Sequence, residues 1–180
     1  MNKLGKRGTQ PRRIASEVSL VAAAWVLSLG FDLFLHAGLL ARLYRQGSPF
    51  LLPPIEAFRR IPLGYASFLI AVLGLLWLFR RLDVRGAGAG VRLGGAVGLT
   101  VWGTVALGLY SVSTGSPALL VGWWLGQSAE LALAGAVLGA RGGGAPLRRI
   151  WLLVGFAVVV AVAVTVVLQS LGLAPAVKMP

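Results

Sequence analysis

The chain has 180 residues, of which 57% are hydrophobic and 12% are charged, and its formal net charge is +12. A soluble domain has about a quarter of its residues charged and could not hide this much apolar surface, so a soluble globular protein is excluded. The absence of cysteine excludes a disulfide framework, a thiolate metal site and a cysteine nucleophile. The basic residues form short clusters between apolar runs and carry no nucleic-acid-binding motif. We therefore expect anionic lipid headgroups, and no nucleic acid, as their partner.

Five apolar stretches approach the roughly 20 residues that a helix needs to cross the hydrocarbon core of a bilayer. They cover residues 18–41, 61–79, 94–112, 117–140 and 150–173. The sequence thus predicts an all-α polytopic transmembrane helical bundle with a single domain over residues 18–173. A basic cytoplasmic tail precedes it at 1–17, and a short tail follows at 174–180. The first stretch is longer than the apolar region of a signal peptide, which favours an uncleaved anchor.

The connection between the first two stretches has the features of a short helix. Pro53 and Pro54 can open a helix, Glu56 then falls in its first turn, and Arg60 near its end complements the helix dipole. Apolar residues such as Phe58 suit contact with the membrane surface. We expect one short interfacial helix here. The alternatives are an ordinary anchored loop and a segment that re-enters the membrane.

Glycine-rich segments predict both loops and close packing. The GAGAG string at residues 86–90 follows no strand and opens no predicted helix, so a flexible loop is expected instead of a phosphate-binding motif. The STGSP string at 113–117 predicts a tight antiparallel turn. Glycine pairs four residues apart allow helices to approach closely, and two such pairs in stretch 117–140 predict a central helix. The pairs are Gly94/Gly98, Gly122/Gly126 and Gly135/Gly139.

The distribution of Lys and Arg predicts the orientation in the membrane. With the N-terminus in the cytoplasm, the cytoplasmic segments carry more than twice as many of these residues as the opposite ones. We therefore expect a multi-pass protein of a bacterial-type inner or plasma membrane, with its C-terminus outside. The first loop runs against this rule, because Arg42, Arg45, Arg59 and Arg60 would all lie outside.

Polar side chains inside the apolar stretches occur mainly on the first and the fourth. Asp32 and His36 are four residues apart and share a helix face, which Ser28 extends by one turn. Gln127 and Glu130, three residues apart, share a face of the fourth stretch. At about 1.5 Å of rise per residue, Asp32, Gln127 and Glu130 fall within one helical turn of each other in depth. The geometry therefore allows a shared buried site but does not require one.

Acidic residues inside a membrane suggest proton chemistry. A central Asp costs about 3 kcal/mol to insert, so such residues usually face the bundle interior and often carry function. A carboxyl group in a medium of low dielectric constant favours its protonated form, and two neighbouring carboxyls can share one proton. The leading hypothesis is a small proton- or solute-linked transport or channel-like protein. Asp32 and Glu130 would titrate, with His36 and Gln127 as their partners.

Two other interpretations use the same residues. In the first, the chain is a structural, accessory or assembly subunit whose buried polar residues only hold helices together, each contact adding about 1 kcal/mol. In the second, more distant one, it is a membrane enzyme. No HExxH or GxSxG motif occurs, a single histidine excludes a bis-histidine haem, and only Asp32, His36 and Glu130 could supply three zinc ligands. We expect no catalytic residue, no cofactor and no metal.

Aromatic residues and oligomeric state complete the predictions. Trp123 and Trp124 lie deeper than an interfacial belt, so with Ser28 they are candidates to line a pocket, ordinary packing being the alternative. Tyr44, near the end of its stretch, is predicted to be an aromatic-belt anchor. The small size of the chain is compatible with a homo-oligomer or with a partner membrane subunit.

Overall fold

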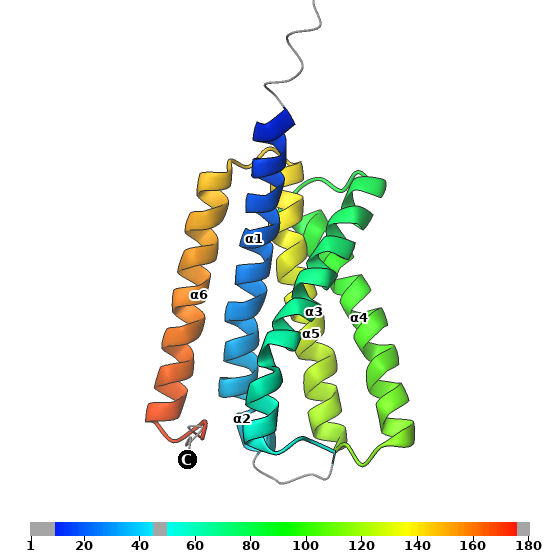
Figure 1. The fold of residues 1–180 in the computed structure, drawn as a ribbon, viewed down its shortest axis with the longest axis vertical. Helices are drawn as coiled ribbons and strands as arrows, with labels where there is room; N and C mark the ends of the chain where they lie inside the picture. The colour runs from blue at the N-terminus through cyan, green and yellow to red at the C-terminus, as the bar shows by residue number, and fades with distance from the viewer. Residues whose placement is uncertain (1–9, 45–49, 176–180) are drawn as a thin grey trace, which may run out of the picture.

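A computed structural model describes residues 10–44 and 50–175 of the chain. These residues form six α-helices and one π-helical segment (Figure 1). In chain order they are α1 (Gln10–Phe34), the π segment (Leu35–Leu39), α2 (Ala41–Tyr44), α3 (Pro54–Arg81), α4 (Ala87–Val112), α5 (Pro117–Gly142) and α6 (Leu147–Ser170). The predicted all-α bundle is confirmed for this part of the chain. Arg45 of the first loop lies outside the described residues.

Four helical segments in the described part of the chain are long and apolar enough to cross a membrane. They are Arg12–Leu39, Ile55–Arg81, Ala87–Val112 and Leu147–Ser170. The chain is therefore a multi-pass membrane protein. The number predicted from the sequence was five, and the difference is α5, which matches the predicted stretch 117–140. This helix is long enough, but Gln127, Glu130 and several glycines lower its hydropathy.

Helix α5 can carry several polar residues in an apolar environment because other helices shield it. It contacts α1, α3, α4 and α6, and its buried residues run along most of its length. Gln127, Ser128 and Glu130 are all buried. A helix that lies within a bundle needs less apolar surface than one that faces lipid, because its neighbours replace the lipid contacts.

Helix α1 begins at Gln10, ahead of the predicted stretch 18–41, because polar residues can continue a helix beyond the bilayer at little cost. The prediction at the start of the next long helix is wrong. The predicted interfacial helix is not a separate element, since α3 runs unbroken from Pro54 to Arg81. Pro62 lies inside α3 and lacks the N–H that would bond the preceding turn, but the helix continues through it.

The prediction that residues 86–90 form a flexible loop is also wrong, because this segment opens α4. The Gly86 N–H donates a hydrogen bond to the Gly139 carbonyl of α5, at 2.8 Å. Gly90 lies directly against Gly135, where a Cβ atom would overlap the carbonyl group of its neighbour. These backbone contacts come from α5, so no local pattern in the sequence could indicate them.

Helices α4 and α5 form the most extensive pair of the bundle. A Cβ atom added at Gly98 would lie 2.6 Å from the Cα of Ser128, so the two backbones approach as closely as glycine allows. On another face of α5, Gly126 makes room for the side chain of Leu35. The central position predicted for this helix is therefore confirmed. We call the α4–α5 contact the glycine seam; its glycines are Gly90, Gly94, Gly98, Gly135 and Gly139.

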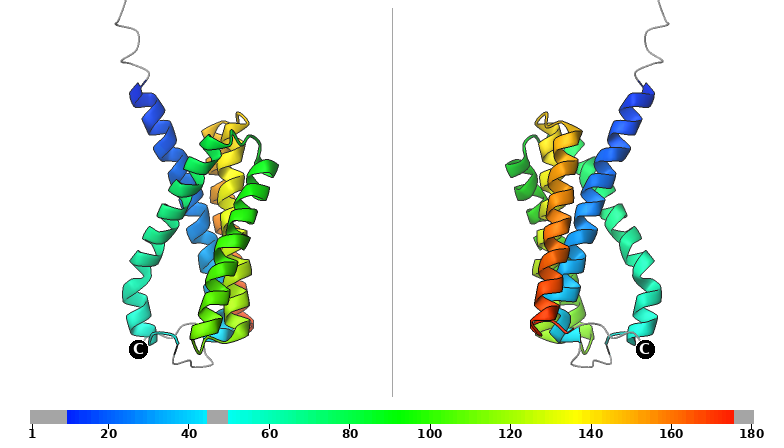
Figure 2. Two further views of the ribbon diagram at one scale, coloured as in Figure 1. Left: turned by 90° about the vertical axis from the view of Figure 1, so that its right-hand side faces the viewer. Right: turned by 90° about the vertical axis from the view of Figure 1, so that its left-hand side faces the viewer.

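The two ends of the bundle differ in character. At the end where α1 begins, an apolar core joins α1, α3, α5 and α6; its larger members include Leu20, Val72, Phe79, Leu138 and Ile150. Toward the other end, α3 diverges from the bundle after crossing α1 (Figure 2). Near this crossing, the indole N–H of Trp25 donates to the carbonyl oxygen of Tyr65 at 2.9 Å. Helix α3 is accordingly the least buried of the four candidate spans.

Candidate functional site

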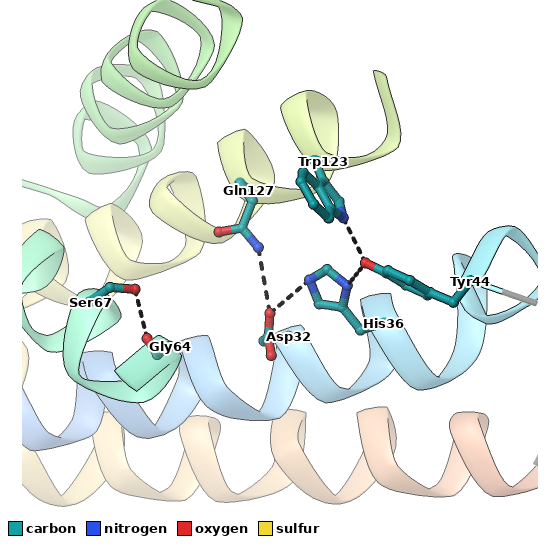
Figure 3. Close-up of polar contacts among 7 residues, drawn as sticks. All are labelled: Asp32, His36, Tyr44, Gly64, Ser67, Trp123 and Gln127. Atoms are coloured by element: carbon teal, nitrogen blue, oxygen red, sulfur yellow. Dashed lines mark hydrogen bonds and ion pairs between the residues drawn. The ribbon is translucent and has the colours of Figure 1, made fainter. Parts of the chain in front are cut away.

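A set of polar side chains joins α1 to α5 in the half of the bundle away from the apolar core (Figure 3). The Nε2 atom of His36, in the π segment, lies 3.0 Å from Oδ1 of Asp32 on α1. From α5, the side-chain amide of Gln127 donates to the same Asp32 oxygen at 3.5 Å. The Asp32 and His36 side chains retain 18% and 30% of their exposure, so they are accessible but largely covered.

Tyr44 extends this set to the end of the bundle. Its hydroxyl group is hydrogen-bonded to Nδ1 of His36, and the indole N–H of Trp123 donates to the same hydroxyl oxygen at 2.6 Å. With Trp123 as donor, the Tyr44 O–H can donate to Nδ1, which leaves the proton of a neutral imidazole on Nε2, facing Asp32. Every donor in this arrangement then has an acceptor.

The π segment gives this part of α1 an irregular backbone. In a regular α-helix, residues eight apart are separated by about 12 Å along the axis, so His36 and Tyr44 would not be neighbours by spacing alone. Here the Leu40 N–H bonds Leu35 at 2.8 Å, the wider turn of a π-helix, and the next short helix carries Tyr44. Gln169 of α6 donates to the Ala37 carbonyl at 3.1 Å. π turns inside helices occur frequently at functional sites.

Glu130 lies at the inner end of the set, and only 2% of its surface is exposed. Ser28 of α1 and Gln127 lie within hydrogen-bonding reach of its carboxyl group, but Oε2 has no hydrogen-bond partner among the described residues. The described Lys and Arg side chains form no ion pair with it either. A buried carboxyl oxygen without a hydrogen-bond partner is costly to keep, and native structures contain few such groups.

Beyond Glu130 and Ser28, the described part of the interior continues as apolar core toward the end where α1 begins. The next buried residues along α5 are Ala134 and Val137, and along α1 in the same direction they are Leu27 and Ala24, all part of the apolar core. The polar residues thus occupy the interior of one half of the bundle, and the apolar core occupies the other half. We call this set the half-bundle network; it comprises Ser28, Asp32, His36, Tyr44, Trp123, Gln127 and Glu130.

The half-bundle network contains most of the residues singled out from the sequence. Ser28, a candidate pocket residue, instead contacts Glu130. Trp124 takes no part, because its indole N–H donates to the Leu99 carbonyl of α4 at 2.9 Å. Both tryptophans border a shallow apolar depression with Trp102, but it encloses no space that could hold a water molecule. Ser67 of α3, also drawn in Figure 3, bonds its own helix at Gly64.

Tyr44 is the member that sequence reasoning missed, since it was expected to be only an aromatic-belt anchor. It lies on α2, just outside the first candidate span. Burial raises the pKa of Tyr44 to about 12, the hydrogen bond from Trp123 opposes this rise, and the charge of Asp32 adds to it. At neutral pH, Tyr44 is therefore a neutral hydroxyl that can donate a hydrogen bond and accept one.

Metal binding was the remaining alternative for these residues. Across residues 10–44 and 50–175, no group of three or more His, Asp or Glu side chains is arranged to hold a metal ion. Asp32, His36 and Glu130 are therefore not arranged as a set of zinc ligands.

Comparison with known proteins finds no matching family model, no similar curated protein and no similar solved structure. The function is therefore inferred from the contacts of the half-bundle network.

Proposed function

We propose that this protein is a small proton-linked membrane protein in which Asp32 and Glu130 bind and release protons. The observation that carries the proposal is the continuous series of polar contacts from Glu130 to Tyr44 in an otherwise apolar interior. A proton is favoured over a larger solute because these side chains contact one another directly. Titrating residues inside spans, facing the bundle interior, are typical of proton relays.

Each member of the half-bundle network has a chemical role in this proposal. His36 can accept a proton at Nδ1 from the side of Tyr44 and release one from Nε2 to Asp32, a transfer that leaves the imidazole neutral. Gln127 donates to Asp32 and reaches Glu130, so its amide holds the two carboxyl groups in place. An amide does not readily carry a proton. Transfer to Glu130 therefore requires the two carboxyl groups to approach each other, and passage across the membrane further requires the helices around the apolar core to separate.

The topology proposed with this function has five crossings, namely the four apolar spans and α5. Helix α5 runs alongside the four apolar spans, and α1 begins at one end of the bundle while α6 ends at the other (Figure 1). An odd number of crossings fits that arrangement. The end rich in arginine would face the cytoplasm by the positive-inside rule, with the C-terminus outside. The half-bundle network would then open toward the outer surface.

The rival proposal is an accessory or assembly subunit, and one observation favours it as well. Contacts from Gln127, Glu130 and Trp123 all join α5 to the α1–α2 segment, which is what residues that only fix helix positions would do. The two proposals differ in whether Asp32 and Glu130 exchange protons with the outside.

Proton flux into liposomes separates the two proposals. Purified protein is reconstituted with a pH-sensitive dye inside the vesicles, and a potassium diffusion potential is imposed. We expect proton uptake by the wild type, and at least a ten-fold slower rate for Glu130→Gln and for Asp32→Asn. Glu56→Gln is the matched control, since Glu56 is exposed on α3 outside the network. If the wild type moves protons no faster than empty vesicles, while the two network variants only unfold at lower temperature, the accessory proposal is favoured.

A further inference from the structure

Most arginines of the described residues lie at one end of the bundle, where α1 begins. The acidic residues of this end are Glu17 and Asp83, and each already forms an ion pair, with Arg80 at 2.8 Å and Arg85 at 3.0 Å. The other arginines at this end form no ion pair within the described ranges. They are Arg12 and Arg13 of α1, Arg81 of α3, Arg92 of α4, Arg141 of α5, and Arg148 and Arg149 of α6. An uncompensated positive field therefore covers this end.

Within this field, the junction of α1 and α6 has hydrogen-bonding groups at defined positions. Among the described arginines of this end, Arg141 alone is half-buried, and its guanidinium donates to Ser16 Oγ at 3.4 Å and to the Ala145 carbonyl at 3.2 Å. One turn further, the Trp151 indole N–H of α6 donates to Ser19 Oγ of α1 at 2.9 Å. The Ser19 hydroxyl keeps its own O–H as a donor, and Arg141 keeps further N–H groups.

Two exposed arginines extend this junction. Arg12 precedes Ser16 by four residues on α1, and Arg148 precedes Trp151 by three on α6, so each shares a helix face with a residue of the junction. Exposed apolar side chains continue the Arg148 face of α6 at helical spacing, namely Leu152, Phe156 and Val159. The groups at this place are thus cationic donors at the helix ends, followed by apolar surface toward the bundle centre.

We propose that the α1–α6 junction binds an anionic phospholipid. Arg12, Arg148 and Arg141 hold the phosphate of its headgroup, with the Ser19 hydroxyl as an added donor, and its acyl chains lie along the exposed apolar residues. Arginine suits this role because its planar guanidinium can bond two phosphate oxygens at once. Basic sites between helices at the membrane surface are known to take anionic headgroups. A soluble anion would use the arginines but would leave the apolar surface without a role.

Lipid binding to the full-length protein in a neutral detergent tests this proposal. Phosphatidylglycerol and phosphatidylcholine are added separately, and binding is followed by native mass spectrometry and by the midpoint of thermal unfolding. We expect phosphatidylglycerol to bind in preference and to raise the midpoint, and 500 mM NaCl to weaken its effect. In the double variant Arg12→Gln/Arg148→Gln, its affinity should fall about 30-fold, which corresponds to about 1 kcal/mol for each arginine near the surface.

The matched control is the double variant Arg59→Gln/Arg60→Gln, which removes an exposed arginine pair from α3 near the opposite end of the bundle. It should bind phosphatidylglycerol as the wild type does. The proposal is overturned if phosphatidylcholine binds equally well, or if the control variant loses as much affinity as the junction variant. Equal protection by inorganic phosphate alone would also overturn it. The lipid comparison and the salt dependence use the wild-type chain, so the test does not depend on the folding of a variant.

Discussion

The glycine seam between α4 and α5 allows a quantitative test of how this bundle is held together. In Gly98→Ala, the new Cβ would lie 2.6 Å from the Cα of Ser128 and 3.0 Å from its carbonyl oxygen. Carbon atoms in ordinary contact are about 3.5–4.0 Å apart, so the two backbones must separate by about 1 Å. Overpacking of this kind costs about 1–3 kcal/mol. The gain in helix propensity from Gly to Ala, about 1 kcal/mol, offsets part of that cost.

We therefore expect Gly98→Ala to lower the free energy of unfolding by up to about 2 kcal/mol. Gly108→Ala, on the same helix, is the matched control, because nothing lies within 4 Å of the position that its Cβ would occupy. That control should leave stability unchanged or raise it by about 1 kcal/mol. Unfolding of the purified protein by increasing mole fractions of sodium dodecyl sulfate measures both. If the two alanine variants unfold at the same point, the seam is not closely packed and the reasoning fails.

Three further outcomes follow from other parts of the molecule. Absorbance at 295 nm during a pH titration should show one tyrosine that ionises near pH 12, and Tyr44→Phe should remove that component. Because this pKa lies above the ordinary value of 10, stability from the neutral hydroxyl is present below pH 10 and is lost as the pH rises toward 12. The chain has no cysteine, so single cysteines can report topology without a background. With five crossings, an impermeant thiol reagent added to whole cells should label Thr114→Cys but not Arg148→Cys, and equal labelling would contradict a crossing by α5. Gln169→Ala removes a hydrogen bond to the π segment and should cost about 1 kcal/mol of stability, whereas no loss in thermal unfolding would show that this bond contributes nothing.

The sequence was most informative where a single helix determines the contact. Asp32 and His36 meet because residues four apart share a helix face, and the structure places their side chains 3.0 Å apart. The apolar runs located four of the spans because hydropathy reports directly on contact with lipid. The glycine pairs indicated close approach, but not which helix approaches which.

Other features depend on partners that are distant in the sequence. Tyr44 reaches His36 through an irregular π turn, and no spacing rule covers such a turn. The segment at residues 86–90 becomes helical because α5 supplies a backbone partner for Gly86. Helix α5 itself falls short in hydropathy because it carries polar residues, and its neighbours shield these residues from lipid. In each case, a local pattern was outweighed by a tertiary contact.

The close pairing of α4 with α5 also bears on how the chain enters a bilayer. Helix α5 by itself would insert into a bilayer unfavourably. Gln127 and Glu130 lie near its middle, and polar residues at that depth cost several kcal/mol. Helix α4 precedes it by a short turn and presents glycines along the face that α5 contacts. On the proposed five-crossing topology, the two helices are thus suited to enter the bilayer together as a hairpin, in which the more apolar α4 accompanies the less apolar α5. A mutation in the glycine seam would then act during synthesis, on the yield of inserted protein, as well as on the stability of the finished fold.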